Sequence, residues 1–329
     1  MTGPLLSVLN LRVEFATRKG PLTALDNVSF DIAPGEVLGV VGESGAGKSL
    51  TGLAIIGLLD PPGRIAGGEI RLDGERIDNL PPDRMRDIRG RRIGIVFQDP
   101  LTSLNPLMRI GDQLTETILA HKPLKRKQAR EQAIAWLGEV GVPSPDKRID
   151  GYPHEFSGGM RQRVVIALAL CAEPQLVIAD EPTTALDVSV QAQIITLLKN
   201  LTRRHGAAVM LITHDMGVIA ETADRVAVMY AGRIAEIGEV HELVRDPLHP
   251  YTQGLMAAIP TLAGRADRLA QIPGAMPRLS AIPRGCAFAP RCPKAFERCA
   301  ERPPFMPVGD RGAACWLYDR ASAAAGVRN

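Results

Sequence analysis

The sequence predicts an α/β fold in which a parallel sheet carries helices on its faces. Apolar runs of strand length alternate with segments of helical periodicity along most of the chain. Two runs, 37–41 and 176–179, are continuously apolar, as expected of strands that are buried on both faces of a sheet. This alternation of strands with helices is typical of a parallel sheet.

The pattern places the expected elements in a definite order. We expect strands over 5–15, 27–32, 37–41, 93–97, 176–179, 209–213 and 226–230. We expect helices over 48–58, 107–141, 157–172 and 188–204, and the helical stretch between 97 and 176 would form a subdomain on the sheet. Prolines become frequent after about residue 251 and the periodicity is lost, so we expect domains at 1–258 and 259–329.

Composition excludes several classes of protein. The chain has 329 residues, of which 45% are hydrophobic and 23% charged, too balanced for a disordered chain. The formal net charge of +3 is weak and gives no reason to expect a nucleic-acid partner. No secretory signal is visible, and no stretch approaches the roughly 18 apolar residues of a membrane span. We therefore expect a soluble, cytosolic chain that needs other subunits to act on a membrane.

A glycine-rich loop follows the buried strand expected at 37–41 and leads into the helix expected at 48–58. It reads Gly42-Glu43-Ser44-Gly45-Ala46-Gly47-Lys48-Ser49, followed by Leu50, and matches the phosphate-binding P-loop pattern in full. Backbone N–H groups of such a loop converge on phosphate oxygens, and the helix N-terminus favours an anion. Lys48 would reach the β- and γ-phosphates, and the Ser49 hydroxyl would ligate Mg²⁺.

Two carboxylates end the apolar run at 176–179. Asp180 is placed to hold Mg²⁺ through water, as the acid of a Walker B strand does. Glu181 could polarise the water that attacks the γ-phosphate. Together with the P-loop, this pair predicts a nucleoside triphosphatase with Lys48 and Glu181 in catalysis.

A second possible anion site precedes the helix expected at 157–172. Ser157, Gly158 and Gly159 stand at its start, where backbone N–H groups would face an anion. A single nucleotide needs only one P-loop. The spare site therefore suggests that ATP is shared between two copies of such a domain, although an ordinary N-cap with flexible glycines is the alternative.

These motifs together resemble the ATP-binding subunits of ABC transporters. The stretch 156–160 is similar to the family signature Leu-Ser-Gly-Gly-Gln, with Phe156 in place of the leucine and Met160 in place of the glutamine. The resemblance covers about residues 5–250. It implies a P-loop NTPase ABC cassette: a RecA-like core with a parallel sheet, an antiparallel β subdomain and a helical signature subdomain, here followed by a small Cys-rich C-terminal module.

The resemblance also implies roles for positions outside the P-loop. Gln98 is similar to the glutamine that senses the γ-phosphate, contributes to the Mg²⁺ site and touches the permease. Asp187, in Ala185-Leu186-Asp187, resembles the D-loop residue that, with Ser157, Gly158 and Gly159, contacts ATP of the facing subunit. His214 resembles the switch histidine, and Phe15 resembles the aromatic that stacks on adenine, although it could simply belong to the core.

A narrower resemblance points to the dipeptide and oligopeptide importer branch. It rests on Phe-Gln-Asp-Pro-Leu-Thr-Ser-Leu-Asn-Pro at 97–106, on His249-Pro250-Tyr251-Thr252 and on the Pro- and Cys-rich tail. It implies two membrane permease subunits, a second and homologous ABC ATPase subunit, an extracytoplasmic binding protein and a place on the cytoplasmic face of the inner membrane. Nickel and other small-solute importers share the pattern, and an exporter or a soluble ABC-type ATPase stays as a remoter alternative.

Four of the five cysteines stand close together near the C-terminus: Cys286, Cys292, Cys299 and Cys315. Such crowding in a cytosolic chain favours a metal or a cluster over disulfides. No pair has the tight spacing of common zinc modules, four thiolates suit an iron–sulfur cluster, and some members of the branch carry [4Fe–4S] on such cysteines. We expect a [4Fe–4S] cluster, with zinc and free thiols or disulfides as alternatives, and expect Cys171 to lie in the core.

Overall fold

The computed structural model describes residues 3–184, 186–258 and 271–319, and this part of the chain divides into two compact units. The first unit comprises residues up to Leu6, Ile32–Val37 and Leu72–Ile212. The second comprises Ser7–Asp31, Leu38–Arg71 and the described residues from Thr213 onward. The chain thus crosses between the units several times, and each unit is built from segments far apart in the sequence.

The first unit contains three neighbouring parallel strands and a group of helices. The strands are β6 (Ile93–Val96), β7 (Leu176–Asp180) and β8 (Ala208–Ile212), with Ile93 opposite Leu176 and Leu176 opposite Ala208. The other elements are β5 (Glu75–Arg76), α2 (Pro82–Ile88), α3 (Pro100–Ser103), α4 (Ile110–His121), α5 (Arg126–Glu139), α6 (Pro145–Arg148), η1 (Pro153–Glu155), α7 (Gly158–Leu170) and α8 (Val188–His205).

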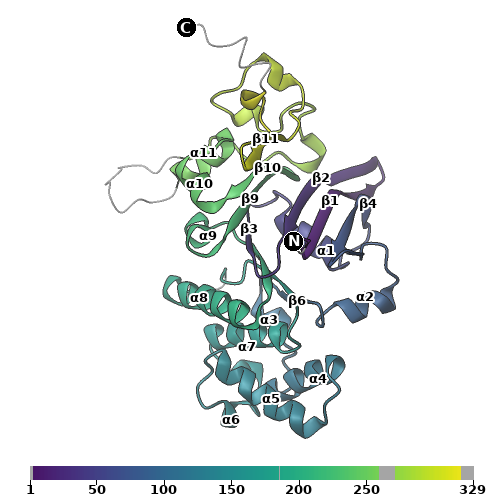
Figure 1. Cartoon of the computed structure of the whole chain (residues 1–329), viewed down its shortest axis with the longest axis vertical. Helices are drawn as coiled ribbons and strands as arrows, with labels where there is room; N and C mark the ends of the chain where they lie inside the picture. The colour runs from purple at the N-terminus through teal and green to yellow at the C-terminus, as the bar shows by residue number, and fades with distance from the viewer. Residues whose placement is uncertain (1–2, 185, 259–270, 320–329) are drawn as a thin grey trace. The chain divides into compact units, whose positions relative to one another are not determined.

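Helix α7 ties the helical group to the strands of this unit. It packs against α3, α4 and α5 and also against β6, and Figure 1 shows α4, α5, α6 and α7 gathered together. Its Val164, Ile166 and Ala167 are completely buried. Cys171 follows its last turn with no exposed surface, which confirms the expected core position, and burial raises the pKa of its thiol to about 12.

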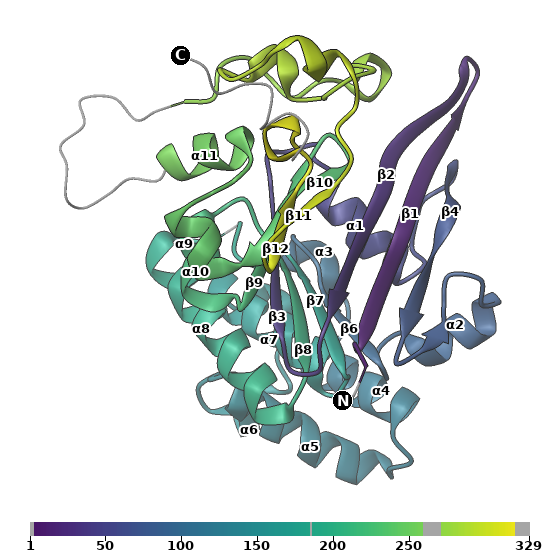
Figure 2. The same cartoon turned by 45° about the horizontal axis from the view of Figure 1, so that its top comes forward.

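The second unit contains a mixed sheet that reaches into the C-terminal segment. Strand β3 (Val37–Val41) is parallel to β9 (Arg225–Tyr230), and β10 (Arg233–Glu239) is antiparallel to β9. Strand β12 (Arg311–Ala313) pairs with β10, and β11 (Met306–Val308) pairs with β12. Figure 2 shows β11 and β12 lying along β10, so the C-terminal segment extends this sheet.

A second sheet in this unit has the strand order β2, β1, β4. Its strands are β1 (Leu6–Thr17), β2 (Gly20–Ile32) and β4 (Gly63–Leu72). This separate sheet corresponds in place to the β subdomain that the family resemblance implies. The remaining elements of the unit are α1 (Lys48–Ile55), α9 (Met216–Thr222), α10 (Val240–Arg245), α11 (Pro250–Ala257), η2 (Leu279–Ala281), η3 (Ala289–Arg291), η4 (Glu297–Ala300) and η5 (Trp316–Tyr318).

Three expected elements differ from those observed. The helical block expected at 107–141 is two helices, α4 and α5, because Pro123 lacks an N–H group and disfavours helical geometry at the residue before it. Helix α1 ends at Ile55, before the expected 58, and Gly57 follows with a φ of 64°. Strand β2 begins at Gly20, seven residues before the expected strand start.

Glu236 fastens the start of α11 to the extended sheet. It lies in β10 opposite Ala313, and none of its surface is exposed. Its carboxylate accepts hydrogen bonds of 2.8 Å from the N–H groups of Leu248 and His249. Burial raises the pKa of Glu236, and these two hydrogen bonds act in the opposite direction by stabilising the charged form.

We predict that Glu236→Ala lowers the free energy of unfolding by about 3 kcal/mol, because two buried N–H groups lose their acceptor. Urea unfolding followed by circular dichroism measures this difference. Glu239→Ala is the matched control, because Glu239 is exposed and its side chain does not cap α10. Equal stability of the Glu236 variant and the native protein would contradict the role given to this carboxylate.

Candidate functional site

The P-loop links β3 to α1 in the second unit. All five residues of β3 are buried, and α1 begins at Lys48. Gly45 and Gly47 have φ values of 83° and 103°, a left-handed region that residues with a Cβ rarely adopt. Positive φ values of this kind allow the tight turn through which backbone N–H groups of such a loop can face a phosphate.

The ammonium group of Lys48 is folded back over this loop. Its Nζ donates to the carbonyl oxygens of Gly42, at 2.8 Å, and Glu43, at 3.2 Å, and the residue is only 5% exposed. Ser49 lies half-buried in the first turn of α1. The arrangement gathers one fixed positive charge and one hydroxyl at a helix N-terminus, which suits a phosphate and its cation.

Phe15 lies near the end of β1 and is half-buried. Its ring is packed against the backbone of Gly63, where an added Cβ would come within 2.9 Å of the ring. Part of the ring remains accessible. Its stacking on adenine stays a prediction.

The carboxylate pair lies at the end of β7 in the first unit. Asp180 is the last residue of the strand, and Glu181 has a φ of 44°, an uncommon conformation for a residue with a side chain. The carboxylate of Glu181 accepts hydrogen bonds from Gln98 Nε2 at 3.1 Å and from the Thr184 hydroxyl at 2.8 Å. Two of the predicted site residues, Gln98 and Glu181, are thus in direct contact, and Thr184 is a partner that sequence reasoning missed.

Strain at Glu181 is held in place by its surroundings. Its backbone N–H donates to Ile212 O at 2.8 Å, and Thr184 N donates back to Glu181 O at 3.3 Å. Residues in sparsely populated backbone regions persist only where neighbouring contacts impose them, and such residues cluster at functional sites. This geometry directs the carboxylate toward Gln98 and Thr184.

The signature stretch forms an exposed helix start. Ser157 is the N-cap of α7 and accepts a hydrogen bond of 3.4 Å from Met160 N. Ser157 and Gly158 are exposed, whereas Phe156 is 3% exposed and belongs to the core. The departure from the family leucine is therefore an exchange of one buried apolar side chain for another. An N-cap and an anion site are compatible, because Gly158 and Gly159 leave their N–H groups near the surface.

The remaining predicted positions lie at helix starts. Asp187 is exposed at the N-terminus of α8, while Ala185 of the same predicted loop lies outside the described residues. His214 is exposed in the second unit, directly before Asp215, whose side chain caps α9. Gln98 and Glu181 of the first unit are in contact, and Lys48 contacts its own loop in the second.

Two residues that contact the P-loop were missed by sequence reasoning. Tyr251, at the start of α11, accepts a hydrogen bond of 2.9 Å from Glu43 N through its hydroxyl oxygen. Arg291 donates to the Glu43 carboxylate at 3.0 Å. Tyr251 stood in the sequence as part of a recognisable His-Pro-Tyr-Thr stretch, but no pattern connected it, or Arg291, with the P-loop.

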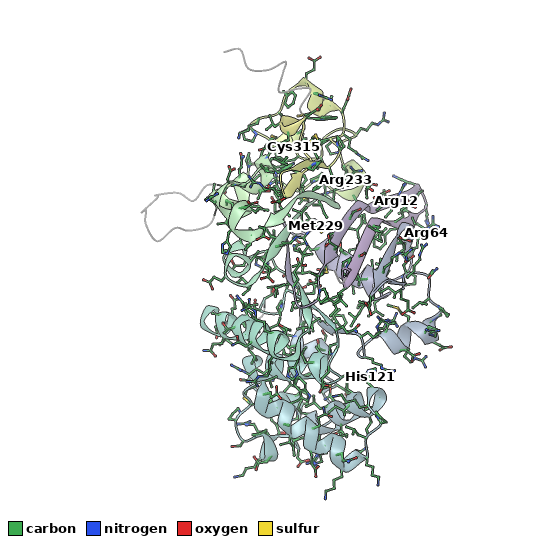
Figure 3. The ribbon with its side chains drawn as sticks, in the orientation of Figure 1. Arg12, Arg64, His121, Met229, Arg233 and Cys315 are labelled. Atoms are coloured by element: carbon green, nitrogen blue, oxygen red, sulfur yellow. The ribbon has the colours of Figure 1, made fainter. Side chains whose placement is uncertain are left out.

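The four C-terminal cysteines are not joined in disulfides and line one small pocket together with Phe296, Trp316 and His249. Figure 3 labels Cys315, which follows β12. Burial raises the pKa of Cys286, Cys292 and Cys315, to about 11 for Cys315, and the charges of the neighbouring thiols add to the shift. Within residues 3–184, 186–258 and 271–319, no three His, Cys, Asp or Glu side chains are arranged to hold a metal ion.

Among the described helices, none combines the length and the apolar character needed to cross a membrane.

Comparison with known proteins places these features in a family. Residues 25–184 match the family model described as ABC transporter, and residues 235–299 match that of the oligopeptide/dipeptide transporter C-terminal region. The chain is 50% identical over 300 residues to the oligopeptide transport ATP-binding protein OppD of Salmonella typhimurium, covering 91% of this chain and 89% of that protein. It is 45% identical over 322 residues to AppD of Bacillus subtilis, covering 97% and 98%.

The fold agrees with solved ABC cassettes. The dimeric post-hydrolysis state of the ATP-binding cassette MJ0796, bound to ADP and Pi, is similar with a TM-score of 0.63 and 30% identity, over 71% of this chain and 98% of that chain. The cbiO1 protein of Clostridium perfringens, part of the cbiONQ ABC transporter complex, is similar with a TM-score of 0.63 and 28% identity, over 74% and 91%. The P-loop, the carboxylate pair and the C-terminal segment thus occur together in a chain that belongs to the ABC transporter family, in its branch of oligopeptide and dipeptide transport ATP-binding proteins.

Proposed function

We propose that this protein is the ATP-hydrolysing subunit of a peptide importer and couples ATP hydrolysis to movement of a membrane permease. The observation that carries the proposal is the P-loop, with the buried Lys48 ammonium folded over a glycine-rich turn at the start of α1. The 50% identity with an oligopeptide transport ATP-binding protein supports the peptide class of cargo.

We assign the ATP contacts to one set of residues. The loop Gly42–Ser49, with Leu50, binds the phosphates, Phe15 stacks on adenine, and Lys48 neutralises charge on the β- and γ-phosphates. The hydroxyl of Ser49, the amide oxygen of Gln98 and the carboxylate of Asp180 are hard oxygen donors, the type that Mg²⁺ prefers. When bound, Mg²⁺ neutralises charge on the phosphate oxygens.

Hydrolysis depends on Glu181 and His214 in this proposal. The Glu181 carboxylate accepts hydrogen bonds from Gln98 and Thr184, so it is oriented and can accept a proton from, or orient, an attacking water. His214 contacts the γ-phosphate. Fixed charges at the phosphates, such as Lys48, contribute most of the rate enhancement because they need no reorganisation during the reaction.

The exposed start of α7 is assigned to the ATP of a facing subunit. Ser157, Gly158 and Gly159 present a helix N-terminus at the surface, and Asp187 stands exposed at the start of α8. An anion is stabilised at a helix N-terminus by unpaired N–H groups and by the helix dipole. Each ATP is then closed between the P-loop of one subunit and the signature of the other.

The partners follow from the importer assignment. We expect two membrane permease subunits, a second and homologous ABC ATPase subunit and an extracytoplasmic peptide-binding protein. The protein would lie at the cytoplasmic face of the inner membrane as a peripheral subunit. Phe97, next to Gln98, and Leu101 are exposed large apolar side chains, and we assign the permease contact to that surface.

We propose further that the four C-terminal cysteines hold a [4Fe–4S] cluster, with zinc as the alternative. Four thiols line one pocket, without disulfides, beside aromatic side chains, and they would have to move closer together to ligate a metal, because no three of the described side chains are arranged to hold one in this structure. Burial, and to a smaller extent the charges of neighbouring thiols, raises the pKa of Cys286, Cys292 and Cys315, and a bound cation would stabilise their thiolate forms. Such a group would cross-link the Cys-rich module expected over 259–329, whose described part, 271–319, contains only short 3₁₀ helices and two three-residue strands.

We predict that Glu181→Gln retains ATP binding but lowers ATP turnover at least about 100-fold, because the amide cannot take a proton. Lys48→Ala should weaken binding itself. ATPase rate and nucleotide affinity, measured separately on the assembled transporter, test the assignment. Glu131→Gln, at an exposed position of α5, is the matched control. Turnover at the native rate in the Glu181 variant would refute the role of this carboxylate.

The shared site predicts a different pattern for Ser157→Arg. The variant should bind ATP at its own P-loop with native affinity, while the site that it completes in the facing subunit loses hydrolysis, because a bulky side chain blocks the helix start. Thr196→Arg, which adds the same charge at an exposed position of α8, should keep both properties. Parallel loss of binding and turnover in a folded Ser157 variant would count against the shared site.

For the cysteines, we predict that protein purified without oxygen is brown and contains about four irons per chain. Cys292→Ser should bleach the colour and loosen the C-terminal segment, while ATP still binds. Iron analysis and visible absorption measure this, and Cys171→Ala, which removes a thiol outside the group, should keep the iron. If the anaerobic protein is colourless and contains one zinc per chain, the cluster proposal is wrong and the zinc alternative is favoured.

A further inference from the structure

Glu43, the second residue of the P-loop, is held through three of its groups within the second unit. Its N–H donates to the Tyr251 hydroxyl oxygen at 2.9 Å, and its carbonyl accepts from Lys48 Nζ at 3.2 Å. Its carboxylate accepts from Arg291 Nη1 at 3.0 Å. One loop residue therefore joins the phosphate-binding lysine to two residues from the C-terminal part of the chain.

Arg291 is held in place by contacts other than the one with Glu43. Its side chain is only 7% exposed, and its Nε donates to the carbonyl oxygen of Pro273 at 2.7 Å. Its Nη1 also donates to the Tyr230 hydroxyl at 3.3 Å, and the guanidinium carbon lies 5.9 Å from the centre of that ring. The planar guanidinium thus fills its donor positions in a rigid setting, so its charge has a fixed place beside the loop.

The tyrosine partner is equally constrained. The Tyr251 ring lies 4.7 Å from that of Tyr230 and 5.4 Å from that of Phe288, measured between ring centres, and Tyr251 has no exposed surface. Arg291 follows Phe288 by one turn of 3₁₀ helix, η3. The three rings and the guanidinium therefore form one packed group, in which displacement of Arg291 moves the neighbours of Glu43.

We infer that Arg291 is a positioning residue for ATP binding, which acts on the P-loop through the Glu43 carboxylate. The inference rests on the proposed ATP site at Gly42–Ser49. Without the guanidinium, an unpaired carboxylate would stand beside a loop that receives a polyphosphate. The carboxylate would repel the nucleotide. Glu43 would also lose the contact that fixes it, and its carbonyl oxygen would no longer be held in place to accept the hydrogen bond from Lys48. The C-terminal segment thereby sets the affinity of a site that the cassette motifs alone define.

The test measures the dissociation constant of Mg·ATP for the purified full chain. Arg291→Gln should raise it about tenfold, the usual size of coupling between two linked groups. Arg291→Lys keeps the positive charge but lacks the planar set of N–H donors of the guanidinium. Its dissociation constant should lie between those of the native protein and the Arg291→Gln variant. Arg284→Gln, which alters an exposed arginine of the same segment, should bind ATP with native affinity.

The double variant separates a positioning role from a general structural one. Glu43→Gln removes the acceptor charge, so adding Arg291→Gln to it should raise the dissociation constant by less than about twofold. In the assembled transporter, Arg291→Gln should raise KM for ATP while kcat at saturating ATP stays within about twofold of the native value. If Arg291→Gln fails to fold, the comparison of Arg291→Lys with and without Glu43→Gln gives the same test.

Two results would overturn the inference. Native ATP affinity in a folded Arg291→Gln protein would show that the contact does not influence the loop. An equal loss of affinity with and without the Glu43 carboxylate would show that Arg291 does not act through it. Failure of the proposed ATP site gives a different result, because the native chain and the Arg284 control would then also lack Mg·ATP binding.

Discussion

The need to hold a polyphosphate with fixed groups governs the arrangement around β3 and α1. A phosphate chain loses much of its hydration when it binds, so the protein must supply N–H groups and positive charge that are already in place. The buried strand β3 anchors one end of the loop and helix α1 the other. Glycines with positive φ make the turn between them, and Lys48 is fixed over it by two carbonyl oxygens.

Glu181 is also a group fixed in advance, but here a residue with a side chain, and not a glycine, adopts the left-handed backbone conformation. Its left-handed conformation costs about 1–3 kcal/mol, which the structure retains because hydrogen bonds to Ile212, Gln98 and Thr184 fix the residue. Glycine would remove the strain and also the carboxylate. A strained residue that keeps its side chain at the end of a buried strand is therefore consistent with selection for chemistry over stability.

The C-terminal segment is an integral part of the second unit. Strand β12 pairs with β10, Glu236 of β10 accepts N–H groups at the start of α11, and Tyr318 donates to Leu248 O at 2.8 Å. Arg291 and Tyr251 then connect this part of the chain with Glu43. A cross-link at the four cysteines would stabilise the segment that carries Arg291. In this chain the C-terminal segment thus contacts the P-loop directly.

The sequence determined the features that depend on local order. The P-loop, the acids after β7 and the serine cap of α7 could be predicted because each is a short pattern next to one strand or helix. Local reasoning was less accurate where a break depends on few residues, as between α4 and α5. It also placed the start of β2 late, because pairing with the neighbouring strand β1 can extend a strand through weakly patterned residues such as Gly20–Asp26.

Only the tertiary structure decided which distant side chains meet. Tyr251 and Arg291 contact Glu43 across separations of 208 and 248 residues, and Gln98 contacts Glu181 across 83. A hydrogen bond between distant residues leaves no periodicity or spacing in the sequence, since its geometry is set by how strands and helices pack. The sequence therefore determined that this protein binds a nucleotide, while the packing of the chain decided which side chains hold the binding loop in place.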